Sequence, residues 1–396
     1  MNLLLFDFIS SFGSEIFAFA CSFYILFITH SSELFGFSLA IVTIIKTISS
    51  PIIGTISDRI NNKKMILSFQ IMSIFSLILF FLFYETSIFI VIIVMGIISF
   101  ADGGVKLIIS SNLSTILDKD IERIVSLRQM IQLFSTIIAP VIGGLLITII
   151  SIKHISLLNI LTETIALLCI LFLSIKSRSS DIENKSSKLL FKEGLNYLKT
   201  KKILLYFIIT SMIANFLAVS IIVGIPIIAI QYFKLEAYQF GFLEMTLPLI
   251  MLLSTIVFSI KPIKQKIYIS YIVSIVIQII VMFSIGIITL LNIGTTKALI
   301  IMIIIYGILG FSISLNNIPY SIYLQREVDD KYKGRVFSIN QALVNILTPA
   351  GMSLYGILFS NENYSLVYFS VSIIMFLTLT CFIKVIYNQK KIHLSN

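Results

Sequence analysis

Four acidic side chains lie inside long apolar stretches of this chain: Glu15, Asp102, Glu163 and Glu244. A charged side chain in a hydrocarbon layer is costly, so such residues usually serve a function. Glu15 lies near the middle of its stretch and is the first candidate for carrying a proton or meeting a substrate charge. A structural hydrogen bond is the alternative role for each of the four.

A second feature is the pair Asp102 and Lys106, which are four residues apart and therefore share one face of a helix. The pair is predicted either to neutralise itself or to take part in proton transfer. Lys46 is a further possible partner for one of the acidic residues. Asp7 is close enough to the end of its stretch to be interfacial.

Other chemistries find little support in the residue pattern. The three cysteines and three histidines are far apart in sequence, so no metal site is expected. The chain has no HExxH or GxSxG motif, which argues against an intramembrane enzyme.

The composition predicts an all-α integral membrane protein. Hydrophobic residues make up 58% of the chain and charged residues 12%, against about 45–50% and about 25% in soluble domains. Lipid is therefore the expected solvent, and spanning segments in lipid must be helical because unpaired backbone groups are costly there. The predicted spans are 5–29, 35–57, 65–84, 88–110, 126–150, 156–176, 203–231, 239–260, 267–291, 297–322, 337–359 and 365–387.

Lysine and arginine are distributed unevenly over the connecting loops. With a cytoplasmic N-terminus, the inner loops and the tail hold 24 basic residues and the outer loops three. The positive-inside rule then places both termini in the cytoplasm of a bacterial inner membrane. This distribution also explains the net charge of +10 without a nucleic-acid partner.

The longest polar stretch divides the spans into two sets of six. Residues 1–176 are predicted to form an N-terminal bundle and 203–396 a C-terminal bundle with a short tail. The linker 177–202 places leucines at helical spacing among lysines, which predicts an amphipathic helix on the membrane surface or a simple tether.

The two halves share an internal repeat. Five residue types recur at one constant offset, at Asp118, Lys119, Arg123, Ser126 and Gln129 and again at Asp330, Lys331, Arg335, Ser338 and Gln341. Halves related by such a parallel repeat bind substrate near the membrane midplane between them. Asn215, Asn316 and Asn317 are plausible polar groups of that cavity, with helix–helix hydrogen bonding as the alternative.

The loop after the second span contains Gly54, Asp58, Arg59, Lys63 and Lys64. Gly54 permits close helix approach, and Asp58 can meet the positive end of a neighbouring helix. The pattern resembles the signature loop of the major facilitator superfamily. That resemblance implies twelve transmembrane helices in two six-helix bundles and a cytoplasmic gate at this loop.

Span 5 contains Pro140, Gly143 and Gly144, which resemble the end of the motif typical of exporters in this superfamily. The stretches 191–198 and 327–356 resemble its macrolide-efflux branch. The resemblance implies proton antiport of a small amphiphilic compound such as an antibiotic, by a monomer in the lipid bilayer. No cofactor is expected, since the proton gradient supplies the energy. Proton-coupled uptake of a metabolite is the alternative.

Overall fold

All regular structure in the computed structural model is helical over the residues it describes, which are 2–57, 61–113, 121–172, 187–261, 267–291 and 293–395. Twelve of its helical segments are long and apolar enough to cross a membrane. These findings confirm the predicted fold class, an all-α integral membrane protein with twelve transmembrane helices.

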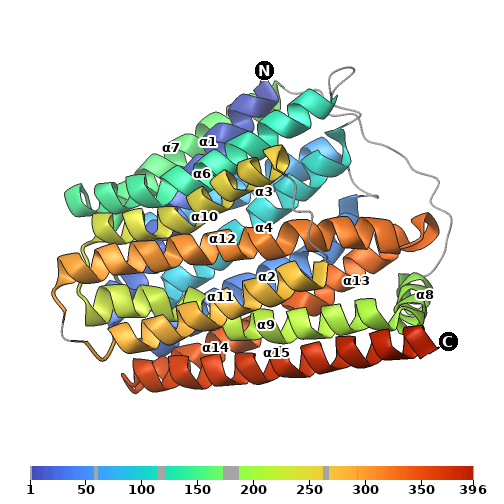
Figure 1. Ribbon diagram of the computed structural model, residues 1–396. Helices are drawn as coiled ribbons and strands as arrows, with labels where there is room; N and C mark the ends of the chain where they lie inside the picture. The colour runs from blue at the N-terminus through green and yellow to red at the C-terminus, as the bar shows by residue number, and fades with distance from the viewer. Residues whose placement is uncertain are drawn as a thin grey trace. The chain divides into compact units, whose positions relative to one another are not determined.

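The described residues form two compact units. Unit 1 comprises the first six long helices and the segment Ala229–Met245. Those helices, labelled in Figure 1, are α1 (Asn2–Thr29), α2 (Ser32–Ser57), α3 (Asn62–Phe83), α4 (Ile88–Ser111), α6 (Ile121–Ile149) and α7 (Ile152–Leu171). Helix α1 packs against α6 and α7, and α3 packs against α4 and α7. The polar residues of α1 therefore face several neighbouring helices rather than lipid.

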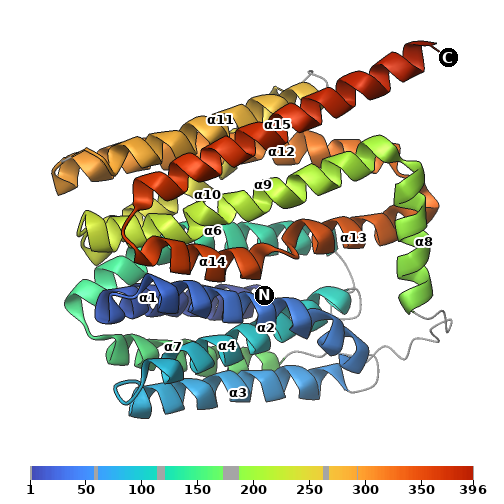
Figure 2. The same cartoon turned by 90° about the horizontal axis from the view of Figure 1, so that it is seen from below.

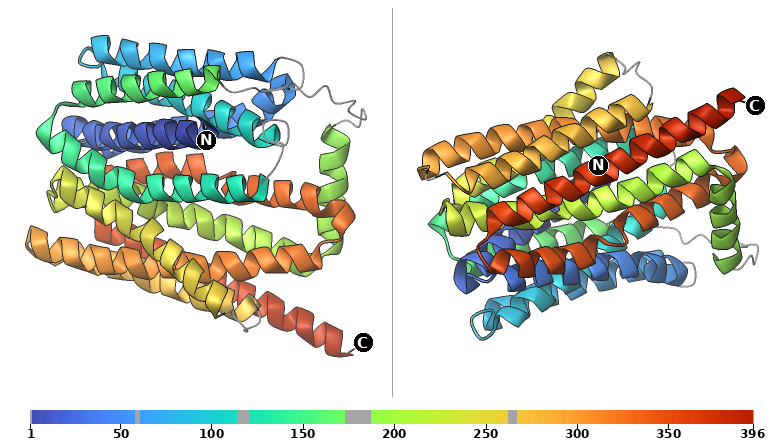
Figure 3. Two further views of the ribbon diagram at one scale, coloured as in Figure 1. Left: turned by 90° about the horizontal axis from the view of Figure 1, so that it is seen from above. Right: turned by 60° about the horizontal axis from the view of Figure 1, so that its bottom comes forward.

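Unit 2 contains the linker helix and the helices of the second half. They are α8 (Ser187–Thr200), α9 (Lys202–Ile227), most of α10 (Ala237–Ile260), α11 (Ile267–Ile288), α12 (Thr295–Glu327), α13 (Lys333–Asn345), α14 (Thr348–Ser360) and α15 (Tyr364–Ser395). A π-helical turn, Ile228–Tyr232, follows α9. Helix α9 packs against α13, α14 and α15, and the right view of Figure 3 shows α15 running beside α9. The domain boundaries at 176 and 203 remain a prediction.

The eleventh span differs from the prediction of one continuous segment over 337–359. It consists of α13 and α14, which are separated by Ile346 and Leu347 and drawn as two pieces in Figure 2. Pro349 explains the break, because proline lacks the backbone donor and its ring clashes with the carbonyl four residues earlier, here that of Asn345. Pro140 lies inside α6 without breaking it.

The later part of the linker helix α8 packs against protein. Figure 2 shows α8 crossing the ends of α9 and α13, and it contacts both. Leu198 is fully buried in a cluster with Leu204, Val336 and Ile339. A position of α8 on the membrane surface stays a prediction, as does its alternative role as a simple tether.

Candidate functional site

The most buried acidic side chain among the four candidates is Glu163 on α7, which is 1% exposed. Ser10 and Ser14, one turn apart on α1, donate hydrogen bonds of 3.2 and 3.1 Å to its Oε1 atom. Gln70 on α3 donates to Oε2 and also to the backbone carbonyl of Glu163. Hydroxyl groups can donate or accept, so this arrangement can accommodate the carboxyl group with or without its proton.

Asp102 on α4 links this buried group to the other charged candidates. It is half-buried and interacts electrostatically with Lys106, Glu15 and Lys46. It also interacts with Glu163. The structure thus brings three of the predicted acidic residues and Lys106 into one network. Glu244 lies half-buried on α10, outside these helices.

Asp7 forms an ion pair with Arg128 that sequence reasoning missed. Arg128 Nε lies 2.5 Å from Asp7 Oδ2, and Nη2 donates to Oδ1 at 3.2 Å. Both side chains are mostly buried within unit 1, and the interfacial depth of Asp7 in the membrane stays a prediction. The sequence did contain a signal for this pair. Asp7 and Arg128 lie equally near the start of their predicted spans, the first and the fifth. The pair lines a cavity of about 390 Å³ together with Lys106 and Gln129.

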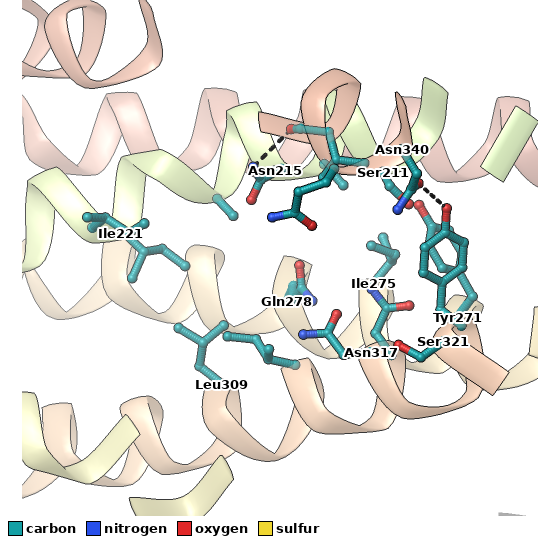
Figure 4. A pocket seen from close by; sticks show the side chains of 18 of the residues that line it. Ser211, Asn215, Ile221, Tyr271, Ile275, Gln278, Leu309, Asn317, Ser321 and Asn340 are labelled. Carbon is teal, nitrogen blue, oxygen red and sulfur yellow. Dashed lines mark hydrogen bonds between the residues drawn. The ribbon is translucent and has the colours of Figure 1, made fainter. Parts of the chain in front are cut away.

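A larger cavity of about 550 Å³ lies within unit 2, between α9, α11, α12 and α13. Its polar lining consists of carboxamides and hydroxyls and includes the three asparagines predicted from sequence. Figure 4 shows Gln278 and Asn317 pointing into it. The carboxamides are those of Asn215, Gln278, Asn316, Asn317, Asn340 and Gln341.

Asn215 also holds the break between α13 and α14. Its Nδ2 atom donates to the backbone carbonyl of Val344 at 3.0 Å and lies 3.2 Å from both Asn345 Oδ1 and Thr348 Oγ1. Both roles predicted for this residue, cavity lining and helix–helix hydrogen bonding, are therefore present in its contacts.

Four lining residues of one cavity stand at the same positions of the sequence repeat as four lining residues of the other. Val125, Arg128, Gln129 and Gln132 line the first cavity, and the residues at the same constant offset, Phe337, Asn340, Gln341 and Val344, line the second. The repeat residues Gln129 and Gln341 thus occupy equivalent positions. The aligned position of Arg128 is an asparagine.

The other repeat-related pair, Arg123 and Arg335, has different surroundings in the two halves. Arg123 is exposed at the start of α6. Arg335 Nη1 lies 2.5 Å from Glu193 Oε2 on α8 and also stacks over Tyr332. The second half therefore uses its arginine to hold the linker helix.

The predicted gate loop is described only in part. Asp58 and Arg59 lie outside the described residues, and Gly54 belongs to α2. Lys63 donates to the backbone carbonyl of Leu171 at 2.8 Å, while Lys64 is exposed. The backbone amide of Lys64 donates to the side chain of Asn61, the N-cap of α3.

The span 5 motif packs α6 tightly against its neighbours in unit 1. A Cβ atom on Gly144 would collide with the backbone carbonyl of Ala237, and one on Gly241 with the backbone carbonyl of Pro140. A Cβ on Gly143 would lie 2.9 Å from the ring of Phe19. Gly144 and Gly241 therefore let the backbones of α6 and the first part of α10 touch, as small residues do in membrane helix pairs, while Gly143 faces α1.

Comparisons with known proteins agree with this architecture. The family model of the Major Facilitator Superfamily matches residues 3–352. Macrolide efflux protein A of Enterococcus faecalis is 20% identical over 311 residues, which cover 76% of this chain and 94% of that protein. Its namesake from Streptococcus pyogenes is 20% identical over 355 residues, or 87% of this chain and 85% of that protein.

Solved structures show the same fold. A bacterial homologue of the iron transporter ferroportin superimposes with a TM-score of 0.75 at 15% identity, covering 97% of both chains. The nucleoside transporter NupG superimposes with a TM-score of 0.71 at 17% identity, covering 97% of this chain and 99% of that one. With the family model matching most of its length, the chain belongs to the Major Facilitator Superfamily of membrane transporters.

Proposed function

We propose that this transporter exports a small amphiphilic compound in exchange for protons, by alternating access. The main observation in support of this proposal is the environment of Glu163. This residue has a carboxyl group enclosed by Ser10, Ser14 and Gln70 inside a membrane-spanning bundle, with Asp102 as an electrostatic partner. A group in this position can take up and release a proton as access to it changes, because its hydroxyl neighbours suit either protonation state.

Among the acidic candidates, the contacts favour Glu163 as the proton carrier. Sequence position alone ranks Glu15 first, but Glu15 is half-buried and connects to the network through Asp102. Asp102 is less enclosed than Glu163 and has the basic neighbours Lys106 and Lys46. We therefore propose that Glu163 carries the proton and that Asp102 and Glu15 influence the electrostatic potential at Glu163.

The export direction is supported by the two macrolide efflux relatives and by the Pro140–Gly144 pattern in α6. Uptake by symport is the alternative, and a nucleoside transporter and a metal transporter are among the proteins that share the fold. We further propose a monomer in the bacterial inner membrane, with both termini cytoplasmic and no cofactor beyond the proton gradient. A role in antibiotic resistance follows if the exported compound is a drug.

Everted membrane vesicles test both direction and coupling. Vesicles that contain the protein are expected to accumulate chloramphenicol, an uncharged amphiphile, when acidified inside, and a protonophore should abolish the accumulation. Vesicles without the protein serve as the control. Proton-driven accumulation in right-side-out vesicles, and not in everted ones, would show that the protein takes its substrate up and does not export it.

A further inference from the structure

Among the described residues, no charged side chain lines the cavity of unit 2. None of the residues that line it is Asp, Glu, Lys, Arg or His. The aligned cavity of unit 1, by contrast, contains Asp7, Lys106 and Arg128. Since the repeat places Asn340 at the position of Arg128, the absence of charge is a property of the second cavity and not of the fold.

Several carboxamides of this cavity are already held by protein. Tyr320 donates to Asn340 Oδ1 at 2.6 Å, and Gln278 Nε2 donates to Ser274 at 3.2 Å. These bonds fix the amide groups in place, so their remaining hydrogen-bonding atoms are presented in defined directions. Such preorganised polar groups in a mostly apolar pocket determine which ligands bind.

Asn316 adds an unsatisfied acceptor. Its Oδ1 atom is buried and has no hydrogen-bond partner among the described residues. A buried acceptor without a partner is costly. Its neighbour Asn317 extends an exposed carboxamide into the same cavity (Figure 4). Together they offer both donors and acceptors to a ligand on one side of α12.

Carboxamides discriminate between ligands by charge. They donate and accept hydrogen bonds with neutral hydroxyl, amide and carbonyl groups at little desolvation cost. A buried ammonium group needs a counter-charge, and the described part of the lining offers no acidic side chain. Tyr271, Tyr306 and Phe337 add aromatic surface for the apolar part of an amphiphile.

We infer that this cavity binds the uncharged, hydroxyl- or amide-bearing part of the substrate and selects neutral compounds over their cationic analogues. This inference rests on the proposed transport function, because it describes the substrate class of that transporter. The volume of about 550 Å³ lies within the range of small-molecule pockets, about 300–1,000 Å³.

Equilibrium binding to the purified full-length protein tests the inference with two matched pairs of probes. They are N-acetylpuromycin against puromycin, and chloramphenicol against its deacylated amine. In each pair the second compound has a free amine, protonated at neutral pH, where the first has an N-acyl group. We expect the neutral member of each pair to bind about tenfold more tightly, the difference expected from one unfavourable polar burial.

Variants of Asn317 locate the selectivity. Asn317→Asp should reverse the preference toward the amines, and Asn317→Leu should weaken binding of the neutral probes about tenfold. Asn361→Asp adds the same charge at an exposed position beyond α14 and should change nothing. Melting temperatures close to that of the wild type would show that the variants fold.

The inference would be overturned if the amines bind as well as the neutral probes, if neither pair binds, or if Asn317→Asp leaves the order unchanged. Binding in detergent needs neither a proton gradient nor a direction of transport. If the protein shows charge selectivity but no proton-driven export, only the proposed function is contradicted. If it shows proton-driven export but no charge selectivity, only the inference about the cavity is contradicted.

Discussion

The side-chain amide of Asn215 on α9 donates a 3.0 Å hydrogen bond to the backbone carbonyl of Val344, at the point where α13 ends. In an unbroken helix this carbonyl would accept the backbone amide four residues on, that of Thr348. Asn215 instead supplies the donor, so one side chain stabilises the interruption of a membrane-spanning segment beside the larger cavity.

We expect Asn215→Ala to lower the free energy of unfolding by about 1–3 kcal/mol, because it leaves a partly buried carbonyl without this donor. The melting temperature of the purified variant measures the effect. Thr210→Ala on the same helix is the matched control, since its hydroxyl bonds only to the carbonyl of Tyr206 in α9. Equal melting temperatures for both variants would mean that Asn215 does not hold the break.

Glu163→Gln should abolish efflux driven by a pH gradient and retain substrate counterflow in proteoliposomes. Glutamine keeps the shape of the side chain but cannot exchange a proton. Exposed Glu33 at the start of α2 provides the control variant Glu33→Gln, which should behave like the wild type.

Glu15→Gln and Asp102→Asn are the competing variants in the same assay. If Glu163→Gln keeps full pH-driven efflux while either of these loses it, the proton is carried by that residue and the assignment to Glu163 is wrong. A loss in all three would indicate that the network acts as one unit.

Gly144→Ala and Gly241→Ala should each impair transport severely, because the added methyl group meets backbone that cannot rotate away. Gly307→Ala is the control. Its added Cβ would lie 3.6 Å from the side chain of Ile250, an ordinary van der Waals contact. Transport rates normalised to membrane abundance measure the difference, and wild-type rates in both test variants would show that the close approach is dispensable.

Docking of the linker helix should depend on Gly194 more than on its ion pair. A Cβ at Gly194 would lie 2.6 Å from Ile339 Cδ1, so Gly194→Val is expected to displace α8 and cost about 1–3 kcal/mol. Arg335→Ala removes a partly exposed pair and should cost about 0–1 kcal/mol.

Limited proteolysis within the linker measures the undocking of α8. Gly334→Ala is the control, because no atom lies within 4 Å of its added methyl group. Cleavage rates that are the same for Gly194→Val and Gly334→Ala would contradict a docked α8.

Membrane orientation is expected to follow the distribution of basic residues. A single cysteine at position 187, in a background without the three native cysteines, should resist an impermeant thiol reagent in intact cells and react after permeabilisation. Strong labelling in intact cells would place the linker outside and reverse the predicted topology.

Sequence alone determined the fold class and the number of spans. Hydrophobic stretches of sufficient length must become helices in lipid, because no other local structure satisfies the backbone there. The repeat was also readable, and it marked Gln129 and Gln341 as related positions, since identical residues at a constant offset need no three-dimensional information.

Only the tertiary structure decided which polar residues meet. Glu163 lies 149 residues from Ser14 in sequence, and Asp7 lies 121 residues from Arg128. Apolar segments are hydrophobic on all sides, so sequence carries little signal for which face of each helix turns inward. Helix packing sets those faces. It therefore decided that one cavity contains charges, whereas the described lining of its repeat-related counterpart has only carboxamides and hydroxyls as polar side chains.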